Sequence, residues 1–193
     1  LPNFGIADGA YHQHADHPGL MTKREVRIQL LADLDLPKNG VLWDLGAGTG
    51  SVGLEALRLR PELQLFAVER RSGVVPLIQA NAERLGVKPV AVLQGDARTL
   101  LAELPDPDRV LLGGGGAARA ELLAVLLSRL RSGGVVVIPL ATLEAVAELR
   151  PVLEAHGLQV SLMQLQVSRG MPLAGGTRLA PLNPVVVLRG CRA

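Results

Sequence analysis

The fold is decided by residues 41–50, which read Val41-Leu42-Trp43-Asp44-Leu45-Gly46-Ala47-Gly48-Thr49-Gly50. An apolar run typical of a buried strand carries an acid, and glycines at alternate positions follow before a helical pattern begins. Because glycine has no Cβ, such a loop can turn sharply and lay its backbone against a ligand. The next helix would aim its N-terminal N–H groups at that ligand. We therefore expect ligand contacts from the loop and from Asp44, which would hold a cationic or hydroxylated group.

The spacing of these glycines separates two kinds of nucleotide site. A nicotinamide or flavin loop has the pattern G-x-G-x-x-G, in which the third glycine would replace Ser51. Here the third glycine comes one residue earlier, at Gly50. With Asp44 before it, a loop of this spacing resembles the first strand and loop of the class I S-adenosyl-L-methionine (SAM) methyltransferases. A tight strand–helix turn without a ligand is the plainer alternative.

The chain length and composition predict one globular domain. The 193 residues are 48% hydrophobic and 20% charged, which fits a single domain spanning residues 1–193 with a sizeable core. No apolar run approaches the ~20 residues of a membrane-spanning helix, so we expect no membrane partner. The single cysteine, Cys191, argues against a disulfide framework or a cysteine-based zinc site and favours a reducing cytoplasm.

The charge pattern argues against nucleic acid as a partner. The formal net charge is only +2, although the sequence pI is about 9.1, and the chain has only four aromatic residues. Nucleic-acid binders usually show dense basic clusters or aromatic stacking platforms. The mild basicity would suit a small polyanionic substrate.

Strand and helix patterns alternate along most of the chain. Strands are predicted at residues 41–45, 65–69, 90–94, 109–112, 135–138, 158–167 and 184–188, and helices from residue 22 and at 51–60, 72–85, 119–130 and 143–156. The first helix would begin in a capping box, Thr22-Lys23-Arg24-Glu25. Residues 168–182 are predicted to be a long loop. The pattern indicates an α/β doubly wound, mostly parallel sheet that ends in an antiparallel hairpin.

Acids follow the second and third predicted strands. An acid about 20 residues beyond the glycine loop accepts hydrogen bonds from ribose hydroxyls in dinucleotide folds, and Glu69 has this position. Asp96 and Ala97, after the third strand, would read the adenine edge. The alternative for Glu69 is a solvated acid facing Arg70 or Arg71.

The N-terminal residues 1–21 are polar and carry His12, His14 and His17. Histidine pairs can bind zinc, but no cysteine and no acids beyond Asp8 and Asp16 support a closed site. We therefore expect no metal and interpret the segment as a polar loop over the active site.

Eight short stretches of the sequence are together typical of one family: Gly5–Asp8, Met21–Arg27, Trp43–Val52, Gly113–Gly115, Leu143-Glu144, Ser168–Gly170, Gly175–Thr177 and Asn183–Val185. Through them the chain resembles the decarboxylating precorrin and cobalt-precorrin carbon-15 methyltransferases of cobalamin biosynthesis. In the bifunctional members, this is the C-terminal half, which follows a carbon-5 methyltransferase. The chain departs from the family in Ala7, where proline is usual, and in Glu69, where aspartate is frequent.

The resemblance implies a class I (Rossmann-like) methyltransferase that uses SAM and acts on a tetrapyrrole, as a homotetramer. SAM contacts would come from Thr22, Gly46, Ala47, Gly48, Thr49, Gly50, Glu69 and Ala97. Gly113, Gly114 and Gly115 would form a floor without side chains for the macrocycle. Arg169 and Arg178, in the predicted loop 168–182, would bind its carboxylates. Lys23, Arg24 and Arg27 are further candidates, and a solvated basic face of the first helix is the alternative for these three. The alternatives are a SAM methyltransferase acting on tRNA or a protein side chain, and a non-catalytic nucleotide-binding module.

Overall fold

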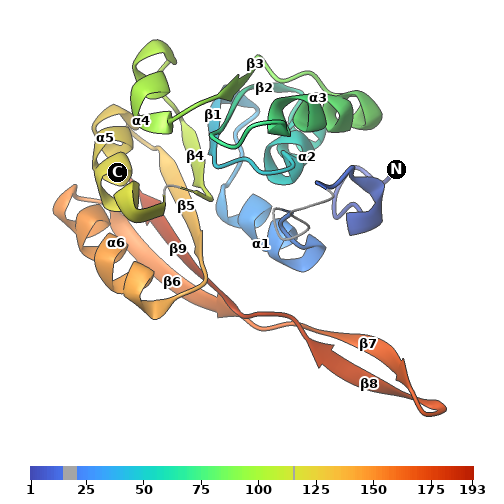
Figure 1. Ribbon diagram of the computed structural model, residues 1–193. Helices are drawn as coiled ribbons and strands as arrows, with labels where there is room; N and C mark the ends of the chain where they lie inside the picture. Colours follow the sequence, from blue (N-terminus) through green and yellow to red (C-terminus); the bar gives the residue numbers. More distant parts are fainter. Residues whose placement is uncertain (15–20, 115) are drawn as a thin grey trace.

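A seven-stranded sheet forms the centre of the molecule (Figure 1). The structure is a computed structural model that describes residues 1–14, 21–114 and 116–193. The strands are β1 (Asn39–Leu45), β2 (Glu62–Glu69), β3 (Ala91–Gln94), β4 (Arg109–Leu112), β5 (Val135–Leu140), β6 (Gln159–Leu165) and β9 (Val185–Cys191). Their order is β3-β2-β1-β4-β5-β9-β6. The first five are parallel, and β9 is antiparallel to both of its neighbours. The predicted doubly wound sheet with a terminal antiparallel pair is confirmed.

Helices cover both faces of this sheet (Figure 1). They are α1 (Arg24–Asp33), α2 (Ser51–Leu59), α3 (Val74–Leu85), α4 (Ala97–Leu100), α5 (Arg119–Arg129) and α6 (Leu143–Ala155), with short 3-10 turns η1 (Asp8–Ala10), η3 (Leu101–Glu103) and η4 (Gly116–Ala118). Because side chains alternate along a strand, Leu42 packs with α1–α3, whereas Trp43 and Leu45 pack with α5 and α6. None of the helices within the described residues is both long and apolar enough to cross a membrane.

The start of α1 differs from the predicted capping box. Helix α1 has Lys23 as its N-cap residue, with no side-chain cap hydrogen bond, and begins at Arg24. The Arg24 amide instead donates to Oδ1 of Asp8 at 2.8 Å. Glu25 pairs with Arg169 rather than reaching back to the helix start. The capping prediction from Thr22 is therefore wrong, because a carboxylate distant in sequence supplies the acceptor.

The predicted loop 168–182 is a two-stranded ribbon of β7 (Ser168–Leu173) and β8 (Gly176–Pro181). Ala174 and Gly175 join the strands with positive φ angles of 44° and 79°, as hairpin turns with the twist of the strands require. The ribbon projects from the body of the molecule (Figure 1). Its strands do not pack on a hydrophobic core, so polar and apolar residues do not alternate along them. The sequence pattern is therefore like that of a loop.

Candidate active site

A cavity of about 390 Å³ lies at the carboxyl ends of β1, β2, β3 and β4. This is the edge at which doubly wound sheets bind ligands, and β1 is the strand from which the order runs in both directions. Of the predicted site residues, the lining contains Gly46, Glu69, Asp96, Ala97, Gly113 and Gly114. It does not contain Thr22, Asp44, Ala47, Gly48, Thr49, Gly50, Arg169 or Arg178. Gly115 lies outside the described residues.

The glycine loop is tied to the end of β2. The amides of Gly46 and Ala47 donate to the carbonyl of Val68 at 2.8 and 3.1 Å. The Gly48 amide donates to Oε2 of Glu69 at 3.0 Å. These three N–H groups therefore stabilise the loop and do not point to a ligand. Among residues 46–50, Gly46 lines the cavity.

Gly46 and the first glycines of the 113–116 run pack against each other. Gly46 has a φ of +78°, and a Cβ there would lie 2.5 Å from the amide nitrogen of Gly114. The amides of Gly113 and Gly114 both donate to the carbonyl of Leu45, at 2.8 and 3.1 Å. Close approach of two backbones thus explains the glycines, and it leaves this wall of the cavity free of side chains.

Glu69 supplies a buried carboxylate to the cavity. Its side chain is only 2% exposed, and it accepts hydrogen bonds from the amides of Gly48 and Arg71 at 3.0 and 3.1 Å and a longer one from Nη1 of Arg71 at 3.5 Å. A carboxylate can accept roughly four hydrogen bonds, so one acceptor position is open and the long Arg71 bond occupies another. The two adjacent hydroxyl groups of a ribose can donate to these positions. Glu69 and the bare backbone opposite therefore fit SAM.

Asp44 lies behind the loop rather than in the cavity lining. It is 2% exposed and accepts a hydrogen bond from the Gly53 amide of α2 at 3.2 Å. Burial raises the pKa of Asp44 to about 7, and the charge of Glu69 adds to this, while the Gly53 hydrogen bond opposes it. Asp44 connects the strand to the first turn of α2, and its ligand contact stays a prediction.

Asp96 and Ala97 line the cavity at the start of α4. The Asp96 carboxylate caps this helix by accepting from the Arg98 amide at 2.9 Å, and it pairs with the Arg98 guanidinium at 2.7 Å. The Arg98 hydrogen bonds lower the pKa of Asp96 to about 2. The adenine contact of Asp96 stays a prediction, because both observed roles are structural.

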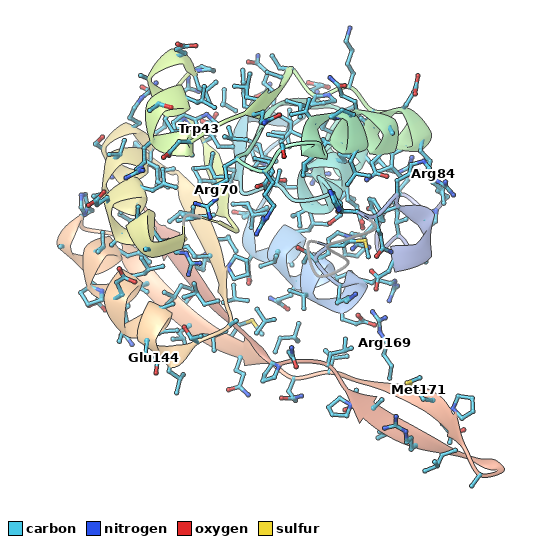
Figure 2. All side chains as sticks on the ribbon, viewed as in Figure 1. Trp43, Arg70, Arg84, Glu144, Arg169 and Met171 are labelled. Atoms are coloured by element: carbon cyan, nitrogen blue, oxygen red, sulfur yellow. The ribbon has the colours of Figure 1, made fainter. Side chains whose placement is uncertain are left out.

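Four arginines line the cavity, and sequence reasoning did not assign any of them to the site: Arg70, Arg71, Arg98 and Arg119. Only their positions in the sequence could have pointed to the site, since Arg70 and Arg71 directly follow Glu69, and Arg119 closely follows the glycine run. A residue next to a strand end can turn into the site or away from it, and sequence alone does not distinguish these directions. Figure 2 shows Arg70 in the central part of the molecule, well away from Arg169 on the ribbon.

The predicted substrate arginines lie on the ribbon. Arg169 on β7 pairs with Glu25 and, at 2.9 Å, with Asp8. These bonds raise the pKa of Arg169, and the same Arg169 hydrogen bond lowers the pKa of Glu25. Arg178 is exposed on β8, opposite Met171. The structure does not bring either arginine to the cavity lining, and their substrate contacts stay predictions.

The N-terminal segment contacts α1, α2 and α3. The amide of His12 donates to Oδ1 of Asn81 at 2.7 Å, and the carbonyl of Thr22 accepts from Arg27 at 2.6 Å. His17 and Asp16 lie outside the described residues. Among the residues that are described, no three histidine, cysteine or acidic groups gather as metal ligands would.

Comparison with known proteins identifies the family. A family model described as "Precorrin methyltransferase domain" matches residues 13–192. A probable cobalt-precorrin-6B C(15)-methyltransferase (decarboxylating) of Pyrobaculum aerophilum is 37% identical over 186 residues, covering 95% of this chain and 94% of that protein. A precorrin-6Y C(5,15)-methyltransferase [decarboxylating] of Sinorhizobium sp is 36% identical over 171 residues, covering 88% of this chain but only 40% of that protein.

Solved structures agree with this assignment. The crystal structure of precorrin-6y C5,15-methyltransferase from Geobacter metallireducens GS-15 has a TM-score of 0.92 and 32% sequence identity. The match covers 100% of this chain and 99% of that one. The predicted fold of the SAM-dependent methyltransferases is confirmed by such neighbours. The chain belongs to the precorrin methyltransferase domain family.

Proposed function

We propose that this chain is a SAM-dependent C-methyltransferase of cobalamin biosynthesis. It would methylate a meso carbon of a precorrin or cobalt-precorrin and decarboxylate an acetate side chain. The names of its relatives support this, because they give methylation at C(15) or C(5,15) and decarboxylation. One observation carries the proposal: in a chain of this family, a buried carboxylate and two bare backbone segments line the same cavity at the strand ends.

The cavity residues would act chiefly by positioning. When bound, SAM supplies a methyl group on a sulfonium, which a nucleophilic ring carbon can take without prior activation by a protein base. Glu69 would hold the ribose hydroxyls, and Gly113 and Gly114 would let a flat substrate approach the backbone. Holding two reactants in line replaces a bimolecular encounter and can supply much of the rate enhancement.

Mass spectrometry on a purified precorrin and on its cobalt form tests this function. Incubation with SAM should add one methyl group and remove one carbon dioxide, with S-adenosylhomocysteine as co-product. Unmodified tRNA and a mixed protein substrate serve as comparison acceptors. Product that shows neither change in mass would overturn the proposal, and methylation of tRNA or protein instead would replace it.

A homotetramer is part of this proposal. The β7–β8 ribbon exposes large apolar side chains to solvent in one chain, with Leu173 57%, Leu179 73% and Met171 47% exposed. Exposed apolar patches and unpaired ribbon edges favour contacts with another copy. Light scattering after gel filtration should give four chains, and Leu173→Asp with Leu179→Asp should give smaller species. A monomer at micromolar concentration contradicts this state.

We further propose that residues 1–193 form one domain and that the protein works in the cytoplasm. The two hydrophobic clusters lie on the two faces of a single sheet, which supports one folding unit. The lone thiol of Cys191 suits a reducing compartment. A single unfolding transition by calorimetry, and fractionation of cells that express the protein, check the two statements.

A further inference from the structure

The cavity carries more positive than negative side chains. Its lining has four arginines but only two acidic residues, Glu69 and Asp96. Arg71 pairs with Glu69 at 3.5 Å, and Arg98 pairs with Asp96 at 2.7 Å and with Glu121 at 3.3 Å. These two arginines therefore have acidic partners inside the protein. In the part of the chain that the structure describes, Arg70 and Arg119 make no hydrogen bond or ion pair with an acid, although the charge of Arg70 helps to lower the pKa of Asp96.

Arg70 and Arg119 reach the same short stretch of backbone from two sides of the cavity. The terminal nitrogens of Arg70 lie 3.9 and 4.0 Å from the point where a Cβ on Gly116 would be. The Nε of Arg119 donates to the carbonyl of Gly114 at 3.0 Å. Its two Nη groups have no hydrogen-bond partner in the described structure. Both guanidinium groups thus keep unused donors next to a wall without side chains.

Arg70 is exposed and Arg119 is half-buried beside the cavity. SAM as a whole brings no net negative charge to this wall, since its sulfonium and ammonium groups outnumber its carboxylate, although that carboxylate taken alone can pair with a guanidinium. A carboxylate fits both arginines because the guanidinium fork matches its two oxygens. The arrangement therefore favours an acidic ligand group.

We infer that Arg70 and Arg119 form a carboxylate-binding pair on the wall of the cavity. The inference deepens the proposed function, since it rests on a substrate that carries carboxylate side chains. The same chemistry could serve the amino-acid end of SAM. In either case, the two arginines position a reactant through its carboxylate, and neither exchanges a proton with it.

Binding measurements without turnover test the pair. Three probes are titrated calorimetrically into the wild type and into Arg70→Gln and Arg119→Gln: S-adenosylhomocysteine, 5′-methylthioadenosine, which lacks the amino-acid end, and the polycarboxylate uroporphyrin. The loss of one charge-assisted hydrogen-bonded pair should weaken binding about tenfold to a hundredfold. Weaker uroporphyrin binding with unchanged S-adenosylhomocysteine binding assigns the carboxylate to the substrate. Weaker S-adenosylhomocysteine binding with unchanged 5′-methylthioadenosine binding assigns it to the cofactor.

Two outcomes overturn the inference. One is unchanged affinity for all three probes, and the other is an equal loss for S-adenosylhomocysteine and 5′-methylthioadenosine, which would indicate adenine contact or misfolding. Arg70→Lys and Arg119→Lys keep the charge but lose the fork, so they should show a smaller loss than glutamine. Arg84→Gln is the matched control, because Arg84 is exposed on α3 and does not line the cavity, and Figure 2 shows it well apart from Arg70.

The test stays separate from that of the proposed function. If the wild type methylates no precorrin, the proposed function fails while the binding of S-adenosylhomocysteine and uroporphyrin still decides the role of the pair. If the wild type methylates a precorrin and the variants bind every probe normally, only the pair is refuted.

Discussion

The Nε of Arg27 donates to Oε2 of Glu55 at 2.7 Å, and neither side chain is exposed to solvent. Arg27 also donates to the carbonyls of Thr22 and Ile6, and Glu55 accepts from the hydroxyl of Tyr11 at 2.8 Å. Burial raises the pKa of Tyr11, so this hydroxyl keeps its proton at neutral pH. A buried polar network, rather than apolar contact alone, attaches the N-terminal segment to α1 and α2.

Glu55→Ala should destabilise the protein by about 3–5 kcal/mol, because it leaves the buried Arg27 charge with only its longer ion pair to Asp8, at 3.4 Å. Urea unfolding measures the change. Glu154→Ala is the control, since it removes the half-exposed partner of Arg150 and should cost less than about 1 kcal/mol. Equal costs for the two variants would show that the buried pair has no special role.

Asp44→Asn should change how stability depends on pH. The folded-state pKa of about 7 lies above the ordinary value of 3.8, so the folded protein binds a proton more tightly than the unfolded chain does. Stability from this group is therefore full at low pH and is lost as pH rises from about 4 to about 7. Asparagine keeps a neutral acceptor for the Gly53 amide and has no charge to bury.

The free energy of unfolding of Asp44→Asn, relative to wild type, should thus be higher at pH 8 than at pH 4.5, about the two ends of this window. Glu148→Gln, on the exposed surface of α6, should leave the wild-type profile unchanged. A constant difference between Asp44→Asn and wild type across this range would contradict the raised pKa.

Glu69→Gln should weaken S-adenosylhomocysteine binding about tenfold to a hundredfold, because hydrogen bonds to a charged acceptor contribute more than neutral ones. Glutamine retains an oxygen for the Gly48 amide, so the loop should keep its shape. Calorimetry measures the affinity, and thermal unfolding checks the fold. Glu69→Asp should retain more affinity than Glu69→Gln. A carboxamide that binds as tightly as the carboxylate would exclude the ribose role.

Gly46→Ala and Gly73→Ala form a matched pair. The two glycines have φ angles of +78° and +74°, so alanine meets similar backbone strain, about 1–2 kcal/mol, at both. At Gly73 the added Cβ meets nothing within 4 Å, whereas at Gly46 it would lie 2.5 Å from the Gly114 nitrogen. Gly46→Ala should therefore lower the unfolding midpoint clearly more than Gly73→Ala. Similar midpoints would show that the Gly46 loop and the backbone at Gly114 can move apart with little loss of stability.

Much of the fold follows from local patterns. The alternation of strands and helices, the glycine loop and the cap of α3 at Gly86, with its φ of +65°, are all visible in short windows. The same windows indicate Glu69, Asp96 and the residues Gly113 and Gly114, which line one cavity because parallel strands end at a common edge.

Contacts between distant residues were not predictable in this way. Asp8 caps α1 from a position far along the chain, and the β7–β8 ribbon depends on pairing between strands that lack a hydrophobic face. The position of Arg169 in the sequence predicts a contact with the substrate, whereas in the structure its side chain pairs with Glu25 and Asp8.

The doubly wound sheet, the glycine loop and the acid at the end of β2 all follow from local sequence patterns. These depend on side-chain period, on glycine's freedom at positive φ and on the order of the strands. Which charges face the cavity depends on tertiary packing instead. Arg70 and Arg119 lie next to strand and helix ends, where a small rotation of the backbone turns a side chain inward or outward. In the structure a hydrogen bond to the Gly114 carbonyl holds Arg119, and Arg70 ends near Gly116, where no side chain stands in its way.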